Sequence, residues 1–270
     1  MSNTIAFIGG GNMASAIIGG LIRQGLPAQR IIVIEPFESA QAKLQRDFGV
    51  TAIAAPGEAL QSANLVVWAV KPQTFKEAAL HTRFHTKNAV HFSVAAGIRS
   101  ESIAHWLGTD RVVRSMPNTP ALIGKGITAL YARTAVSADD KIVVEKVIST
   151  TGDFVWLDDE AHLDAVTALS GSGPAYVFYF MEAMIEAGVD MGLSREQAGR
   201  LAIGTFAGAS ELARMSTEPL EILRQRVTSK GGTTYAAITS MDQDRLGTLF
   251  IRAIHAAKQR AKTLGDEFGV

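Results

Sequence analysis

The chain has 270 residues, 47% hydrophobic and 19% charged, so it can bury a core as one large or two ordinary domains. Its 26 basic residues balance 26 acidic ones, which argues against a nucleic-acid partner. The absence of cysteine excludes disulfides, a thiol nucleophile and Cys-ligated zinc. No secretion signal and no apolar run long enough to span a membrane is visible, so we expect a cytoplasmic protein with no membrane partner.

Short apolar runs alternate with helix-like segments over the first 158 residues. The runs are rich in β-branched residues and several are apolar on both faces, which is typical of buried parallel strands. This alternation predicts a Rossmann-type, doubly wound α/β domain. The expected strands are 5–9, 31–35, 51–55, 65–70, 89–95, 111–116, 126–132 and 154–157, and the expected helices are 12–25, 38–49, 72–84, 100–108 and 138–152.

Beyond Asp158 every segment has a helical period and none reads as a strand. The sequence therefore predicts two domains: a dinucleotide-binding α/β domain, 1–159, and an all-α domain, 160–270. Two of the later helices are apolar around most of their circumference, so they need burial on nearly all sides. We expect this domain to mediate dimerisation, with Gly199, Gly204 and Gly208 allowing close helix approach.

The segment "TIAFIGGGNMASAIIGGLI" places three glycines between an expected strand and an expected helix. Gly9, Gly11 and Ala14 fit the dinucleotide fingerprint G-x-G-x-x-A, in which glycines make the turn and let the pyrophosphate approach the backbone. The helix N-terminus then favours the diphosphate. We therefore predict that Gly9, Gly11, Asn12, Met13 and Ala14 bind a nicotinamide dinucleotide, NADPH or NADH.

Glu35 follows the second expected strand, where a carboxylate can accept hydrogen bonds from the adenosine ribose and disfavour a 2′-phosphate; the alternative is a solvated loop acid. Other expected strand ends supply further candidates, because ligands bind at the carboxyl ends of parallel strands. These cofactor-binding candidates are Ala69, Val70, Lys71, Pro72, Ala95, Gly97 and Asn118. Lys71 could instead pair with an acid, and Asn118 could instead brace its turn.

Two later motifs have the composition of anion sites. In "SKGGTTYAAI" the glycines let the chain bend, Thr233 or Thr234 can cap the next helix, and free amides can hold a carboxylate. A plain capped turn is the alternative. In "SGSGPAY" Pro174 is expected in the first turn of a helix and Ser172 is a candidate cap.

Together these motifs resemble pyrroline-5-carboxylate reductase over nearly the whole chain. The resemblance rests on "FIGGGNMASAIIGGL", "AVKPQ", "SVAAGI", "RSMPNTPALIGKG", "LSGSGPAYV" and "TSKGGTTYAAI" in that family's order. It implies an oxidoreductase acting on a C=N bond, which uses NAD(P)H to reduce the cyclic imine 1-pyrroline-5-carboxylate to L-proline, the last step of proline synthesis. It also implies a Rossmann domain followed by a helical domain that forms a homodimer, with possible assembly into a ring.

The resemblance assigns the substrate to the loop Ser229–Thr234. It implies that Ser229, Gly231, Gly232, Thr233 and Thr234 bind the small-molecule substrate, and that the Thr234 hydroxyl lies near the ring nitrogen, with Ser229 and Thr234 as the catalytic candidates. The chain departs from the family pattern at Pro56, at Lys230, where many members have proline, and at Glu35, where NADPH-preferring members often have a small or basic residue.

Two other functions remain open from the residues alone. A β-hydroxyacid dehydrogenase would use a lysine in the second domain, but no lysine lies between Lys146 and Lys230. A non-catalytic dinucleotide sensor would not need the anion loop. His81 and His85 are spaced as a metal pair on a helix, but no acid completes a ligand set, so we expect no metal.

Overall fold

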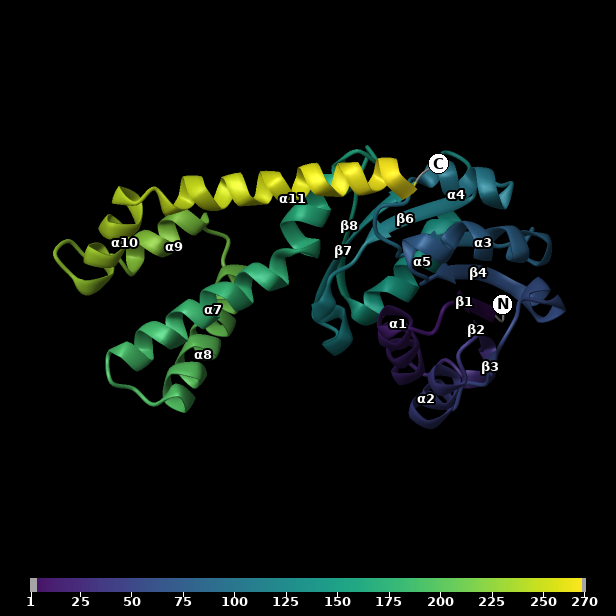
Figure 1. The fold of residues 1–270 in the computed structure, drawn as a ribbon, viewed down its shortest axis with the longest axis horizontal. Helices are drawn as coiled ribbons and strands as arrows, with labels where there is room; N and C mark the ends of the chain where they lie inside the picture. Colours follow the sequence, from purple (N-terminus) through teal and green to yellow (C-terminus); the bar gives the residue numbers. More distant parts are fainter. Residues whose placement is uncertain (1–3, 269–270) are drawn as a thin grey trace. The chain divides into compact units, whose positions relative to one another are not determined.

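The structure, a computed structural model, describes residues 4–268. It contains an eight-stranded sheet, and each of its strands overlaps a strand that the sequence predicts (Figure 1). The order across the sheet is β3-β2-β1-β4-β5-β6-β7-β8, and every neighbouring pair is parallel except β6 and β7. The strand order reverses between β1 and β4, which is where ligands bind in doubly wound sheets. The strands are β1 Thr4–Ile8, β2 Ile31–Ile34, β3 Ala52–Ile53, β4 Ala63–Trp68, β5 Val90–Ser93, β6 Val112–Met116, β7 Gly126–Ala132 and β8 Gly152–Trp156.

Helices cover both faces of the sheet, which explains why the strands are apolar on both sides. In β1, Ile5 and Phe7 pack with residues of α1, α2 and α5, whereas Ala6 and Ile8 pack with residues of α3 and α4. The predicted doubly wound α/β fold is therefore confirmed. The helices are α1 Asn12–Arg23, α2 Glu38–Phe48, α3 Pro72–Thr82, α4 Ser100–Leu107 and α5 Ala138–Ile148.

From Asp158 onward the described chain contains helices and no strand, as predicted. The elements are α6 His162–Val166, a π-helical segment Thr167–Gly171, α7 Gly173–Asp190, α8 Arg195–Met215, α9 Leu220–Arg226, α10 Thr233–Gln243 and α11 Leu246–Phe268. The chain divides into two compact units, of which Gly173–Ala256 forms the second. The first unit runs on to Ser172 because α6 packs against β6 and β7 and buries Leu163. The division at residue 159 remains a prediction.

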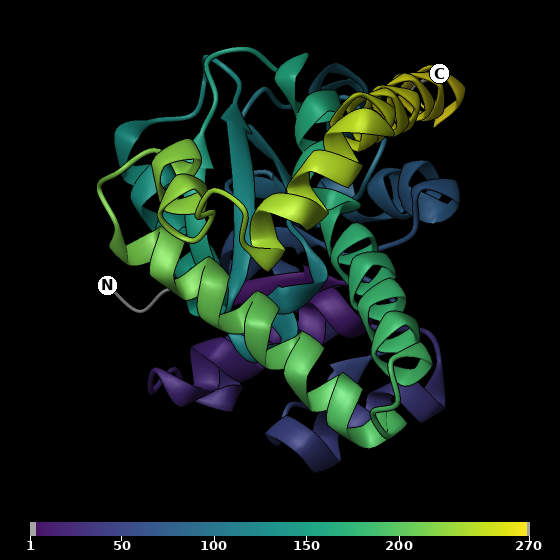
Figure 2. The same ribbon diagram turned by 90° about the vertical axis from the view of Figure 1, so that its left-hand side faces the viewer.

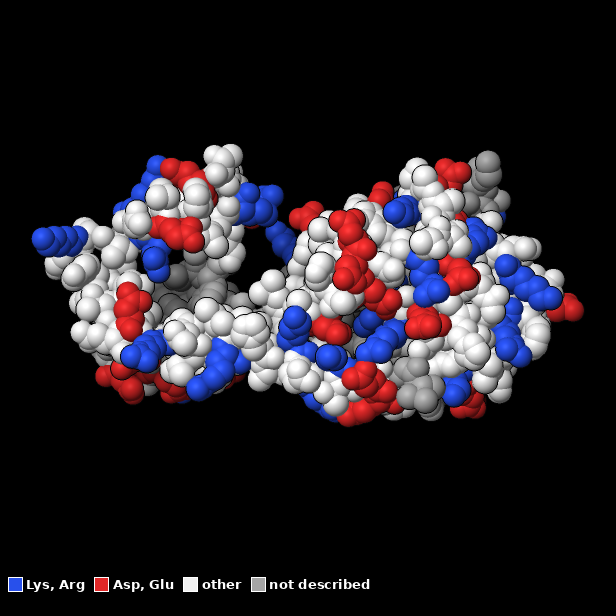
Figure 3. All heavy atoms as spheres, turned by 90° about the horizontal axis from the view of Figure 1, so that it is seen from above, with Lys and Arg blue, Asp and Glu red and all other residues white. Residues whose placement is uncertain are grey.

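The helical unit Gly173–Ala256 leaves much apolar surface uncovered. Its helices α7 and α8 run side by side (Figure 2) and approach closely where Gly188 faces Ala198. Charges of both signs are interspersed on the face drawn in Figure 3, where uncharged side chains cover much of this unit. The exposed apolar side chains of α7 and α8 are Val177, Phe178, Tyr179, Met184, Leu201, Ile203, Leu212 and Met215.

A buried ion pair fixes the start of α4 to the segment that precedes α6. The Glu160 carboxylate accepts hydrogen bonds from the Ser100 N–H (2.7 Å) and from Arg114 Nη1 (2.9 Å). The Arg114 side chain is only 6% exposed, and loss of its carboxylate would leave a buried cation unpaired, which is strongly destabilising. The pair holds the chain leaving β8 against the sheet.

A buried histidine joins β4 to β5. The Trp68 indole N–H donates to His91 Nδ1 over 3.0 Å, and the Trp68 ring stacks on Phe75 with centroids 4.8 Å apart. Burial lowers the pKa of His91 from 6.5 to about 4, because desolvation disfavours the charged ring. His91 is therefore neutral at physiological pH and serves as a hydrogen-bond acceptor in the core.

We expect acid to destabilise the fold through His91. Between about pH 7 and pH 5 the unfolded chain binds a proton that the folded protein excludes, so the free energy of unfolding falls by about 2 kcal/mol from this group. In His91→Gln, which keeps an acceptor but cannot titrate, the same pH change should cost correspondingly less. Denaturant melts at both pH values measure this. Exposed His81→Gln is the control, and an identical pH dependence in His91→Gln and the wild type would refute the assignment.

Candidate functional site

The first glycine of the fingerprint lies where the ends of β1 and β4 come together. Gly9 has φ +94°, and a Cβ there would lie 2.6 Å from the Ala69 carbonyl oxygen. Its N–H donates to the Ile34 carbonyl over 2.8 Å, while the Ala69 N–H donates to Ile8 over 2.8 Å. Only glycine satisfies both the backbone conformation and the contact, so Gly9 sets the turn that enters α1.

The second glycine leaves the N-terminus of α1 open. Gly11 is the N-cap residue with φ −71°, no side chain caps the helix, and a Cβ at Gly11 would meet nothing within 4 Å. The first main-chain bond of the helix runs from the Ser15 N–H to the Gly11 carbonyl, so the amides of Asn12, Met13 and Ala14 precede the helical hydrogen-bond ladder. Uncapped amides at a helix N-terminus attract phosphate.

Ala14 has the packing role expected of the third fingerprint position. It is fully buried within the core cluster formed by α1 and the sheet. A small residue is needed there for close helix–strand contact. All three fingerprint positions thus have the geometry of a dinucleotide-binding turn.

Glu35 is buried, and its carboxylate points back to the glycine loop rather than standing in solvent. Oε2 accepts the Gly10 N–H over 2.8 Å and Oε1 accepts the Phe37 N–H over 3.0 Å. The interpretation as a solvated loop acid is therefore wrong. The carboxylate positions the loop, and each oxygen retains a lone pair that could meet a ribose hydroxyl; that ribose contact remains a prediction.

The end of β4 forms one wall of the same crevice. Ala69 and Val70 contact Gly9, and Pro72 is the first residue of α3, as the sequence predicts. Lys71 is the N-cap residue of α3; it is exposed and forms no ion pair with any carboxylate among residues 4–268. The alternative in which Lys71 pairs with an acid finds no support.

The end of β5 is partly covered by the last turns of α11. Gly97 has φ +74°, and a Cβ there would lie 3.5 Å from Leu264 Cβ. Ala95 is buried, whereas Ala96 between them is exposed. Ala95 and Gly97 thus follow β5 as the sequence predicts, and their contact with the cofactor remains a prediction.

Asn118 braces its turn and links two motifs that lie far apart in the sequence. Its Oδ1 accepts the Ile127 N–H over 3.0 Å, and its Nδ2 donates to the Ser170 carbonyl over 3.3 Å. A Cβ at Gly171 would lie 2.4 Å from the Met116 methyl. The structure thus brings "MPNTP" and "SGSGP" together, an association that no local sequence signal reveals. The bracing role is observed, and a cofactor contact by Asn118 remains a prediction.

The expected cap at Ser172 is wrong. Ser172 has helical dihedral angles, and its N–H donates to the Thr167 carbonyl over 2.8 Å, which closes a π-helical turn. The segment from α6 onward therefore does not stop at a cap before Pro174. Single π turns are frequent at functional sites, and this one coincides with the "SGSGP" motif.

The loop Ser229–Thr234, within the helical unit, forms a tight turn before α10. Gly231 has φ +77° and the Gly232 N–H donates to the Ser229 carbonyl over 3.0 Å. A Cβ on Gly232 would lie 2.7 Å from Ser229 Oγ, so glycine at this position lets the hydroxyl lie over the turn. Gly231 is thus favoured by its positive φ, and Gly232 leaves space for the Ser229 hydroxyl.

The expected capping of α10 by Thr233 or Thr234 is also wrong. The N-cap residue is Gly232, and no side chain caps the helix. Thr233 and Thr234 are the first two helical residues, and the first main-chain bond runs from the Ala236 N–H to the Gly232 carbonyl. An uncapped N-terminus beside the Ser229 and Thr234 hydroxyls can hold a carboxylate.

The fold and the glycine loop define a dinucleotide-dependent oxidoreductase of the Rossmann type, in which the N-termini of α1 and α10 have no side-chain cap. Residues 4–97 match the family model described as NADP oxidoreductase coenzyme F420-dependent, and residues 160–264 match that for pyrroline-5-carboxylate reductase dimerisation. A pyrroline-5-carboxylate reductase of Pseudomonas aeruginosa is 46% identical over 98% of each chain. The chain belongs to the pyrroline-5-carboxylate reductase family.

Solved structures agree with this relationship. A pyrroline-5-carboxylate reductase from Coxiella burnetii has 37% identity and a TM-score of 0.92, with 98% of this chain and 99% of that chain covered. The Plasmodium falciparum enzyme, solved with NADP bound, has 26% identity and a TM-score of 0.86, with coverages of 97% and 98%. The family resemblance and the nicotinamide cofactor predicted from the motifs are confirmed.

Among residues 4–268, no helix has the length and apolar character needed to cross a bilayer. Within the same range, no three His, Cys, Asp or Glu side chains are grouped so that they could hold a metal ion.

We expect Glu35 to control which nicotinamide the protein prefers. Loss of its charge in Glu35→Gln should lower the ratio of kcat/KM with NADH to kcat/KM with NADPH by about tenfold. That factor corresponds to the free energy of one charge-assisted hydrogen bond. Steady-state kinetics with both cofactors measure the ratio. Glu38→Gln, on an exposed neighbour, is the matched control. A ratio unchanged in Glu35→Gln would show that the carboxylate only braces the Gly10 amide.

Proposed function

We propose that the protein is a pyrroline-5-carboxylate reductase, which reduces the cyclic imine 1-pyrroline-5-carboxylate to L-proline with NAD(P)H, the last step of proline biosynthesis. The observation that carries this proposal is the 46% identity to a relative of that name over 98% of both chains. The two glycine-bearing segments support it, because the reaction needs a dinucleotide site and a carboxylate site, and each segment suits one of them.

The residues of the first unit fit a dinucleotide. The amides of Gly11 and the first turn of α1 would hold the pyrophosphate, Gly9 keeps the loop against Ala69, and Glu35 fixes the Gly10 amide. Ala69, Val70, Lys71, Pro72, Ala95, Gly97 and Asn118 would complete the cofactor site. When bound, the reduced nicotinamide supplies the hydride that the imine carbon receives.

The residues of the loop Ser229–Thr234 fit the substrate. The amides of Thr233 and Thr234, unused by the helix, would hold the carboxylate, and Ser229 Oγ adds a donor over Gly232. Lys230, which is exposed, adds a positive charge to this loop. Fixing the carboxylate orients the ring, and holding the reactants in the right orientation lowers the activation free energy of such a reaction substantially.

The Thr234 hydroxyl is the group that we assign to the ring nitrogen. A hydroxyl can both donate and accept, so it can orient the imine nitrogen whether or not it carries a proton. Reduction adds a hydride to carbon and leaves the nitrogen with one proton that comes from water. A protonated imine is already electrophilic, so orientation rather than strong acid catalysis is the role of Thr234.

Replacement of Thr234 by alanine should lower kcat/KM for the imine about 10- to 100-fold, the usual loss for one positioning group. Thr234→Ser, which keeps the hydroxyl, should recover most of the activity. Absorbance loss of NADPH in the presence of the imine gives the rates. Ser240→Ala, on the same helix, is the control. Wild-type activity in Thr234→Ala would remove this role from the residue.

We also propose that the protein is a homodimer assembled through its helical unit, with a ring of dimers as the larger form. The exposed apolar residues of α7 and α8 support this, since large uncovered apolar patches mark interfaces. Gly204 and Gly208 leave bare backbone, because a Cβ on either would meet nothing within 4 Å. A monomeric mass by analytical ultracentrifugation would contradict the dimer. A cytoplasmic location, and the absence of nucleic-acid partners, remain predictions.

A further inference from the structure

A pocket of about 410 Å³ lies at the amino-terminal ends of β5 and β6, whereas the glycine loop follows the carboxyl end of β1. It is lined near the start of β5 by His91 and before β6 by Leu107 and Thr109. The predicted cofactor residues follow the carboxyl ends of the parallel strands, whereas this pocket adjoins their amino ends. Nothing in the reductase reaction uses it.

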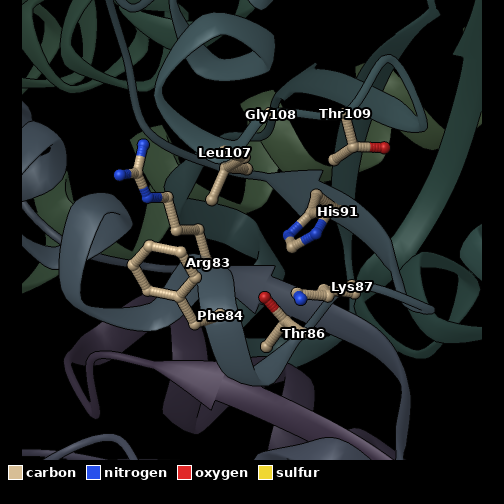
Figure 4. A pocket seen from close by; sticks show the side chains of 8 residues that line it. All are labelled: Arg83, Phe84, Thr86, Lys87, His91, Leu107, Gly108 and Thr109. Carbon is tan, nitrogen blue, oxygen red and sulfur yellow. The ribbon is translucent and has the colours of Figure 1, made fainter.

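Two cations at this pocket have no carboxylate partner. Arg83 and Lys87 both line it (Figure 4), and neither forms an ion pair within residues 4–268. The Arg83 guanidinium lies 4.6 Å from the Phe84 ring centroid, and its Nε is buried without an acceptor. Buried polar atoms normally have partners, so Arg83 is an incompletely satisfied cation.

Two acids close to the pocket in sequence are already paired. Asp140 pairs with Arg111, and Asp110 pairs with Arg133. Arg111 also donates to the Asn88 carbonyl and acts electrostatically on His91. Among residues 4–268, the only charged residues that line the pocket are Arg83 and Lys87, so its lining is positive, which favours an anion.

The remaining wall is apolar or neutral. Phe84 and Leu107 supply hydrocarbon surface, and His91 supplies a ring whose Nδ1 is occupied by the Trp68 N–H. Thr86, almost fully buried, donates its hydroxyl to the Thr82 carbonyl. In Figure 4 Arg83 and Phe84 lie on one side of the pocket, and His91 and Lys87 lie on the other. A ligand with an anionic end and a hydrocarbon body matches this lining.

We propose that this pocket binds a small organic anion, whose carboxylate or phosphate group is attracted by the cations Arg83 and Lys87 and whose apolar body packs against Phe84 and Leu107. Two tryptophans lie close to the pocket and can report its occupancy. Trp68 donates a hydrogen bond to His91, and Trp106 directly precedes Leu107. Occupancy should therefore change tryptophan fluorescence.

The test is titration of the whole protein, saturated with NADPH, with phenyl phosphate, benzoate and neutral benzyl alcohol, by calorimetry and fluorescence. At least one anion should bind saturably below about 10 mM, and the alcohol at least about tenfold more weakly. The tighter of the two anions identifies the head group as phosphate or carboxylate. Absence of saturable anion binding, or equal binding of the alcohol, would overturn the proposal.

Variants localise the binding. Arg83→Gln/Lys87→Gln should weaken the anion about tenfold or more, and Lys146→Gln, an exposed cation on α5, should leave it unchanged. The single variant Lys87→Gln, at an exposed position, should weaken binding even where the double variant folds poorly. Unaltered affinity in Lys87→Gln and in a folded double variant would place the anion elsewhere and refute the site.

Discussion

The contact between Gly9 and the Ala69 carbonyl is the constraint on which the nucleotide site depends. Gly9 has φ +94°, and a Cβ added there would lie only 2.6 Å from that oxygen. No other residue therefore lets β1 turn into α1 while β4 ends beside it. The same turn delivers the bare N-terminus of α1 to the crevice where the strand order reverses. The glycines therefore cost backbone entropy but leave main-chain amides open to the dinucleotide that we propose binds there.

The same physical device recurs in the helical unit. There a glycine with positive φ, Gly231, precedes Gly232, whose missing side chain leaves room for the Ser229 hydroxyl. In each case the helix that follows has no side-chain cap. A capping side chain would occupy amides that a ligand needs, so both N-termini are free to meet one, although α2, α3, α4 and α9 also lack a side-chain cap.

Much of this was predictable from the sequence. All eight strands coincide with short apolar runs bounded by turn residues, and in central strands such as β1, β5 and β6 burial on both faces gives a continuous apolar pattern. The turn at Gly9 and the buried packing position of Ala14 follow from the spacing of the fingerprint, and the structure has both; pyrophosphate binding at Gly11 stays a prediction. The helix expected over 72–84 begins at Pro72, whose fixed φ suits the first helical position.

Other features depend on residues far apart in the chain and were not predictable. The second hydrogen bond of Asn118 goes to Ser170, 52 positions away, and Glu35 reaches back 25 positions to Gly10. The caps expected at Ser172 and at Thr233 or Thr234 were wrong because capping preferences describe only local sequence. The structure instead has a π turn that ends at Ser172 and a glycine, Gly232, as the N-cap residue of α10.

We propose that bare main-chain amides at the N-terminus of α1 hold the dinucleotide, and Gly11→Ala tests this most directly. Gly11 has an ordinary φ and open space around its Cβ position, so the protein should fold with an unchanged Tm. If the pyrophosphate lies against this backbone, the added methyl should raise the Kd for NADPH by about tenfold or more. An unchanged Kd in a fully folded Gly11→Ala protein would contradict the account.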